Sequence, residues 1–88
     1  MNTIRIKEWK ADQIDIEAKR FNTFCDVVYR VSENDVHYYK QEDGSVIYKV
    51  REVLKETEKA IYVHLESGLV DGSFKGWKTW VPKSAIIA

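Results

Sequence analysis

Histidine and cysteine, the side chains most often used as nucleophiles, general bases and zinc ligands, are few in this chain and lie far apart in its sequence. The two histidines are His37 and His64, and the only cysteine is Cys25. A zinc site needs Cys and His residues grouped at short spacings, and these three are not so grouped. The chain also has no Walker loop, G-x-S-x-G elbow, G-x-G-x-x-G loop or H-E-x-x-H helix. We therefore predict no catalytic residue, no metal and no cofactor, and we do not expect an enzyme.

Apolar and aromatic residues toward the C-terminus are better candidates, and their chemistry is that of binding. The stretch 67–76 mixes apolar residues with three of the four glycines. This composition predicts a long irregular loop, and such loops are often functional. Two tryptophans follow on a predicted strand, and because strand side chains alternate between two faces, one indole is expected at the surface. The sequence therefore predicts a protein-binding surface of five residues: Leu69, Val70, Phe74, Trp77 and Trp80. The structural alternative is a loop that folds back over one end of the domain, with both indoles packed.

A second interpretation uses the basic residues of the same half of the chain. Lys plus Arg equals Asp plus Glu at 14 each, but phosphate binding needs positive charge only locally. Basic residues alternate along one predicted strand and recur beside the tryptophans, and aromatic side chains can stack on bases. Single-stranded nucleic-acid binding would use Lys49, Arg51, Tyr62, Lys75 and Lys78. The same charges are also typical of an ordinary solvated surface.

These candidates must be positioned by strands, because the dominant hydrophobic period of the sequence is two. The alternation predicts strands over residues 3–9, 23–32, 35–41, 45–54 and 59–66. A last predicted strand follows them and contains both C-terminal tryptophans. Asp43-Gly44 predicts a tight turn before residue 45. Residues 55–58 are polar and short enough to close a hairpin, and the rival interpretation is one helix over 50–59. Cys25 falls on an apolar strand face, which predicts a small core residue.

Residues 12–21 fit two kinds of element. Asp12 could cap a short helix whose apolar stripe contains Ile14 and Ala18. Ile14 and Ile16 also fit the alternation of a strand. We leave both interpretations open and favour the helix.

The predicted fold class is mainly β. A chain of 88 residues with 44% hydrophobic residues is expected to form a single domain over residues 1–88. Short strands joined locally are typical of a small antiparallel SH3-like or related barrel, here with one short helix if residues 12–21 coil. Closure of the sheet would also remove the exposed strand edges that promote aggregation.

The cysteine content and the N-terminus bear on compartment. A single cysteine, Cys25, permits no internal disulfide, which favours a reducing compartment. The N-terminal residues show no apolar run like that of a secretory signal, and no apolar stretch approaches the length that spans a bilayer. We therefore expect a cytoplasmic protein with no membrane partner.

The end of the chain carries a short motif, Trp80-Val81-Pro82-Lys83-Ser84-Ala85-Ile86. It resembles a C-terminal signature, W-(V/I)-P-K-S-x-I, of small and mostly uncharacterised β proteins of phages and bacterial mobile elements. The resemblance covers roughly residues 50–87 and assigns no functional residue. It implies a phage or mobile-element setting, in which such proteins act as accessory or anti-defence factors.

Taken together, these observations predict a non-catalytic macromolecular binding module. Another protein is the expected partner, and single-stranded nucleic acid is the alternative. A homodimer is a further alternative, because an exposed indole and apolar loop side chains can pair across a two-fold axis.

Overall fold

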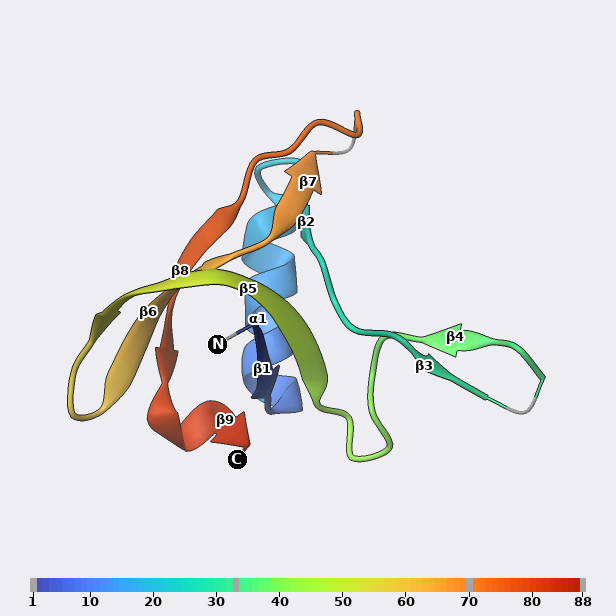
Figure 1. Ribbon diagram of the computed structural model, residues 1–88, viewed down its shortest axis with the longest axis horizontal. Coiled ribbons are helices and arrows are strands. Elements are labelled where there is room, and N and C mark those ends of the chain that lie inside the picture. Colours follow the sequence, from blue (N-terminus) through green and yellow to red (C-terminus); the bar gives the residue numbers. More distant parts are fainter. Residues whose placement is uncertain (1, 33, 70, 88) are drawn as a thin grey trace.

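The computed structural model describes residues 2–32, 34–69 and 71–87. In these residues one helix and one 3-10 turn accompany nine short strands (Figure 1). The elements are β1 Thr3–Ile6, α1 Glu8–Lys19, β2 Thr23–Cys25, β3 Arg30–Val31, β4 His37–Tyr38, β5 Val46–Glu56, β6 Ala60–Leu65, β7 Ser67–Leu69, β8 Trp77–Pro82, η1 Lys83–Ala85 and β9 Ile86–Ile87. The prediction of a mainly β fold with antiparallel sheets and one short helix is confirmed.

Five strands form the main sheet, in the order β8-β6-β5-β1-β9, and every neighbouring pair is antiparallel. β5 and β6 form the predicted hairpin, so the rival helix over 50–59 is wrong. The register of this pair shifts twice, between Val50 and Glu52 and between Val53 and Lys55. Such irregularities bend a strand, and Figure 1 shows β5 as a long curved ribbon over the helix.

The two edge strands of this sheet, β8 and β9, are joined by the single turn η1. At the start of the turn, the Lys83 N–H donates to Lys59 O at 2.8 Å, and at its end the Lys7 N–H donates to Ala85 O at 2.8 Å. The chain thus crosses from one edge of the sheet to the other in a strand, a turn and a short second strand. Among the described strands no ladder joins β8 to β9, so backbone hydrogen bonds do not close the sheet into a barrel.

The segment predicted as helix or strand is helical, but its boundaries differ from the prediction of 12–21. α1 begins at Glu8, and Lys7 occupies the N-cap position without a side-chain cap. The proposed cap at Asp12 is therefore wrong. The strand predicted over 3–9 ends at Ile6, because Trp9 already lies in the helix. The predicted start of the helix depended on a capping side chain, and the residue that precedes α1 supplies none.

One face of α1 lies on the sheet. Ala11, Ile14 and Ala18 are fully buried there, whereas Trp9 and Ile16 are more than half exposed. Two of these three residues are alanines with small side chains, so Ile14 supplies the largest buried side chain of this face. Burial of this stripe holds the helix in place, since an isolated helix of this length is marginal in water.

Tyr48 of β5 joins the sheet to the helix through a buried polar contact. Its ring is fully buried, and its hydroxyl lies 3.1 Å from Ala11 O and 3.0 Å from Asp15 Oδ1. A phenol has one hydrogen, so the hydroxyl donates to one of these two oxygens at a time. The same burial raises the pKa of Tyr48 above its ordinary value, which keeps the phenol neutral.

The strand predicted over 23–32 is broken into three parts, because its pairing partner changes along the chain. β2 pairs with β7, Val27 forms an isolated bridge with Tyr48 of β5, and β3 pairs with β4. The strand predicted over 35–41 shrinks to His37–Tyr38. Alternation alone indicates an extended chain, but the partners of that chain come from the tertiary fold.

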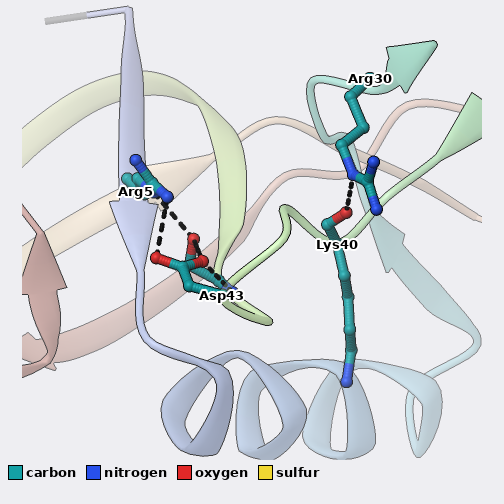
Figure 2. Close-up of polar contacts among 5 residues, drawn as sticks. Arg5, Arg30, Lys40 and Asp43 are labelled. Carbon is teal, nitrogen blue, oxygen red and sulfur yellow. Dashed lines mark hydrogen bonds and ion pairs between the residues drawn. The ribbon is translucent and has the colours of Figure 1, made fainter. Parts of the chain in front are cut away.

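β3 and β4 belong to an arm (residues 29–32 and 34–40) that projects away from the rest of the molecule in Figure 1. At the root of the arm, the Arg30 Nε donates to Lys40 O at 2.7 Å (Figure 2). The Lys40 ammonium lies 2.8 Å from Glu8 Oε2 and 3.2 Å from Asp12 Oδ1. These contacts attach the arm to α1, and the ion pairs raise the pKa of Lys40 above its ordinary range.

The turn before β5 contains the predicted Asp43-Gly44 pair and an ion pair to β1. Asp43 Oδ1 accepts hydrogen bonds from the Ser45 N–H and hydroxyl, and its Oδ2 lies 2.8 Å from Arg5 Nη2 (Figure 2). Hydrogen bonds from Ser45 and then the Arg5 guanidinium lower the pKa of Asp43 from 3.8 to about 2. A carboxyl whose pKa is lower in the folded state stabilises the fold above its unfolded pKa.

We expect the contribution of Asp43 to stability to be lost as the pH falls from 3.8 toward 2, because protonation breaks these contacts. Asp43→Asn should therefore flatten the pH dependence of the thermal midpoint in this window. The measurement is thermal unfolding followed by circular dichroism at several pH values. Glu58→Gln, in the exposed β5–β6 turn, is the control. A variant at residue 43 that keeps the wild-type pH profile would contradict the assignment.

Candidate protein-binding surface

The predicted loop 67–76 is only partly irregular. Its first residues form β7, which pairs with β2, so the prediction of a loop from residue 67 is wrong at this end. The glycine-rich composition of residues 67–76 did not indicate that their first part would pair with a distant strand. The segment then returns toward β8, and Phe74 forms an isolated bridge with Gly68. Val70, one of the five predicted binding residues, lies outside the described residues.

The two C-terminal tryptophans lie on opposite faces of β8, as predicted. Trp77 is partly buried and packs against the hydrophobic core, and its ring lies 5.6 Å from that of Phe21. Trp80 is 43% exposed and packs on Tyr62, with the ring centroids 5.0 Å apart. Tyr62 and Trp80 are direct cross-strand partners. The expectation that one indole is exposed is confirmed, and the exposed one is Trp80.

The β2–β7 ribbon lies beside the C-terminal end of α1 (Figure 1). Thr23 pairs with Leu69, and both belong to the face that turns toward the helix end. On this side, Leu69 lines a shallow depression together with Phe21, Asn22 and Asp71. Two of the predicted binding residues, Leu69 and Trp77, thus lie near Phe21 and are only partly exposed. Their main role is to pack the β2–β7 ribbon against the rest of the protein.

The opposite face of the ribbon carries an exposed aromatic patch, which we define as Phe24, Gly68, Phe74 and Arg51. Phe24 and Phe74 are the partners of Gly68 on its two sides, and directly paired residues present their side chains to the same face. Phe24 is 49% exposed and Phe74 is 57% exposed. Two half-exposed rings therefore lie in adjacent strands around a residue that has no side chain.

Two close contacts order the aromatic patch. A Cβ at Gly68 would lie 3.4 Å from Phe24 Cζ, so the ring of Phe24 occupies the space that a side chain would fill. The Arg51 guanidinium carbon lies 4.6 Å from the centroid of the Phe74 ring, within the range of a cation–π interaction. Sequence analysis selected Phe74 but missed Phe24. The available signal was the alternation of residues 23–32, which places Phe24 on the face opposite Cys25, but only the ladder with β7 shows that this face is exposed.

The five residues of the nucleic-acid interpretation are distributed over separate places. Arg51 lies on Phe74, and Lys75 lies 5.6 Å from the centroid of the Phe21 ring. Lys49 pairs with Thr3 of β1 and lies in a shallow hollow beside Glu66. Tyr62 and Lys78 belong to neighbouring rows of the β6–β8 ladder, where Lys78 pairs with His64. Two of these places combine a lysine with a pair of packed aromatic rings: Lys75 lies beside Phe21 and Trp77, and Lys78 lies one row from Tyr62 and Trp80 on the same face of the ladder.

A further concave site lies between α1, β2 and the root of the arm, and the sequence did not indicate it. This cavity has a volume of about 350 Å³ and is lined by Asp15, Lys19, Thr23, Phe24, Cys25, Val27, Tyr29 and Tyr39. Burial raises the pKa of Asp15. Burial and the neighbouring carboxylates of Asp15 and Asp26 raise the pKa of the Cys25 thiol to about 12. The thiol is therefore neutral at physiological pH and a poor nucleophile.

The described parts of the chain bear on two further kinds of site, a metal centre and a membrane-crossing helix. Over these residues, no three His, Cys, Asp or Glu side chains come together in a way that could hold a metal ion. Within residues 2–32, 34–69 and 71–87, α1 falls short of the length and apolar character of a membrane-crossing helix.

Comparisons with known proteins add no relative to this geometry. No protein-family model, no curated protein and no solved structure matches the chain.

Proposed function

We propose that this protein is a non-catalytic binding module that recognises another protein through the aromatic patch. The observation that supports it most directly is the pair of half-exposed rings, Phe24 and Phe74, with Arg51 stacked on one of them. Aromatic residues and arginine are the side chains that most often dominate the binding energy of protein interfaces. Their chemistry fits a partner that presents an apolar surface with an acidic group for Arg51.

The placement of the patch also favours binding. Both rings lie on paired strands or beside them, and Gly68 and Arg51 restrict their positions. A side chain that is ordered before binding loses less conformational entropy when the complex forms. Exposed aromatic side chains gathered in one place are also more typical of interaction sites than single exposed apolar residues.

The proposed setting follows from the C-terminal signature and the cysteine content. The resemblance of the segment 80–86 supports an accessory or anti-defence role in a phage or mobile element. Cys25 as the only cysteine supports the cytoplasm. The partner would then be a protein of the bacterial host or of the element itself, with a second copy of this chain as the homodimeric alternative.

The test is affinity capture from a bacterial lysate with quantitative mass spectrometry. We expect a captured protein whose recovery falls at least about tenfold when Arg51→Ala and Phe74→Ala are combined, since loss of central contacts typically weakens binding by more than 1 kcal/mol. Trp9→Ala is the matched control, because Trp9 is equally exposed at 56% but lies on α1. Sedimentation at several concentrations shows whether the captured partner is a second copy.

The proposal fails if the captured proteins are the same for the wild type, the double variant and the Trp9→Ala control. It also fails if nothing is captured beyond background. Circular dichroism of each variant separates a loss of binding from a loss of fold, and both patch side chains are exposed enough for little structural effect to be expected.

Single-stranded nucleic-acid binding remains the second candidate, and one observation favours it. Lys55, Tyr62 and Trp80 are consecutive partners across β5, β6 and β8, and the two rings are stacked. Aromatic stacking beside lysines is typical of sequence-tolerant binding to single strands. The test is titration of a labelled oligonucleotide at low and moderate salt, where charge-driven binding falls steeply as salt rises. Absence of binding at low salt removes this candidate, and so does binding that Trp80→Ala leaves unchanged.

A further inference from the structure

The cavity at the root of the arm adjoins the aromatic patch, because Phe24 belongs to both, and its position makes it a candidate ligand site. Its lining comes from α1, from β2 and the segment after it, and from the chain that returns from β4. Its volume of about 350 Å³ lies within the range of about 300–1,000 Å³ that is usual for small-molecule sites. The cavity can therefore enclose a small organic group.

Three of the residues that line this cavity are aromatic: Phe24, Tyr29 and Tyr39. They are 49%, 60% and 46% exposed, so the core does not need their full surface. Tyr29 and Tyr39 both lie at the root of the arm, one where the chain enters it and one where the chain leaves it. The Arg30–Lys40 hydrogen bond connects these two segments. Aromatic residues gathered around a cavity are the means by which proteins recognise alkylated ammonium groups.

The charged groups of the cavity are Asp15 and Lys19, both from α1. Asp15 is partly buried, and its carboxylate receives a hydrogen bond from Tyr48 when that hydroxyl points toward it. Burial raises its pKa, so its charge is poorly solvated and would be stabilised by a cation nearby. Lys19 is exposed, and its ammonium can extend into solvent at the rim.

The polar groups of the lining distinguish among cations. The Thr23 hydroxyl already donates to Phe21 O at 3.0 Å, and Lys40 beside Tyr39 is held by Glu8 and Asp12. Asp15 is thus the one carboxylate of the lining, and the other side-chain oxygens there belong to neutral hydroxyls, among them those of Tyr29 and Tyr39. A primary ammonium has three donors to satisfy, whereas a quaternary ammonium has none and needs only ring faces and a negative charge.

We infer that this cavity binds a quaternary ammonium group, with Phe24, Tyr29 and Tyr39 around the methyl groups and the Asp15 carboxylate as counter-charge. Two kinds of ligand carry this group, namely a trimethylated lysine side chain and a choline headgroup. The inference does not depend on the proposed protein-binding function, because Phe24 is the one patch residue that lines the cavity, and the Arg51 and Phe74 side chains tested for that function do not.

The test is an NMR titration of the full chain with choline chloride and with 3,3-dimethylbutan-1-ol. The alcohol has the same shape, but a carbon replaces the charged nitrogen, so the comparison isolates the charge. We expect choline to shift the amide signals of residues 15–29 and 39 in a saturable way, with sodium chloride at equal ionic strength giving no such shift. The neutral alcohol should bind at least about tenfold more weakly, since cation–π contacts contribute about 0.5–2 kcal/mol each. Equal affinity for the two compounds overturns the inference, and so does the absence of saturable binding.

Variants connect the binding to the lining residues. Tyr39→Leu and Asp15→Asn should each weaken choline binding at least about fivefold, and Tyr38→Leu should leave it unchanged. Tyr38 is the matched control because it is a similarly exposed arm residue, at 42%, that does not line the cavity. If Asp15→Asn fails to fold, the exposed Tyr39 still provides the test. Choline binding that survives both variants contradicts the assignment, and Arg51→Ala/Phe74→Ala should retain it whether or not the proposed function holds.

A comparison of trimethyllysine amide with phosphocholine distinguishes the two sources of the ammonium group, and Lys19→Ala tests how the charge at the rim acts on each compound. Trimethyllysine amide carries a net positive charge, so removal of Lys19 should strengthen its binding. Phosphocholine carries a phosphate that Lys19 can pair with at the rim, so the same change should weaken its binding. The tighter-binding compound of the two identifies the natural ligand class, and failure of both to bind overturns the inference.

Discussion

Ile14→Ala is expected to lower the free energy of unfolding by about 2–5 kcal/mol. Ile14 is the largest of the buried side chains of α1, and its shortening would leave a cavity between α1 and the sheet. A domain of this size has a total stability of about 4–13 kcal/mol, so the loss is a large fraction of it. Thermal or urea unfolding followed by circular dichroism measures the change, and the thermal midpoint should fall by about 10 °C or more.

Ile16→Ala is the matched control, because it makes the same chemical change in the same helix. Ile16 is 56% exposed, and alanine has the higher helix propensity, so the variant should lie within about 0.5 kcal/mol of the wild type. Similar losses for Ile14→Ala and Ile16→Ala would show that α1 does not lie on the sheet through the face described above. The cavity that contains Asp15 would then have no fixed wall.

Gly76→Ala should destabilise the fold more than Gly72→Ala, although both glycines have a positive φ, of 82° and 91°. The left-handed backbone itself costs a residue with a Cβ about 1–2 kcal/mol. At Gly72 nothing lies within 4 Å of an added Cβ, whereas at Gly76 that atom would lie only 2.0 Å from His64 Nε2. We therefore expect Gly76→Ala to cost at least about 1 kcal/mol more, because the His64 ring must also move.

A double-mutant cycle separates the two costs at Gly76. His64→Ala removes the ring, so Gly76→Ala in that background should cost about as much as Gly72→Ala. Urea unfolding of the four proteins of the cycle gives the coupling energy. A coupling near zero would mean that the His64 ring moves away freely, and the extra cost predicted for Gly76 would be refuted. The same contact matters for the surface, since Gly76 connects Phe74 to the start of β8.

Residues that depend on local physics were predictable from the sequence. The period of two predicted a strand over residues 45–54, and in the structure every second residue at its start, namely Val46, Tyr48 and Val50, is buried. The polar residues 55–58 predicted the β5–β6 hairpin, although Lys55 and Glu56 continue β5 and the turn lies at residues 57–59. The spacing of Trp77 and Trp80 placed them on opposite faces of one strand. In each case the pleat of a strand assigns alternate side chains to opposite faces, whatever the strand pairs with.

Features that depend on which segments meet were not predictable. The aromatic patch requires β2 and β7 to pair, although Phe24 and Phe74 are 50 positions apart in the sequence, and the cavity requires the arm to return to α1. The start of α1 also escaped prediction, because Lys7 gives no capping signal. The period of the sequence by itself determined which residues extend and which of them face inward, since that information is local. Only the tertiary structure decided which extended segments become neighbours, because the long-range pairing that builds a surface or a cavity leaves no repeat in the chain.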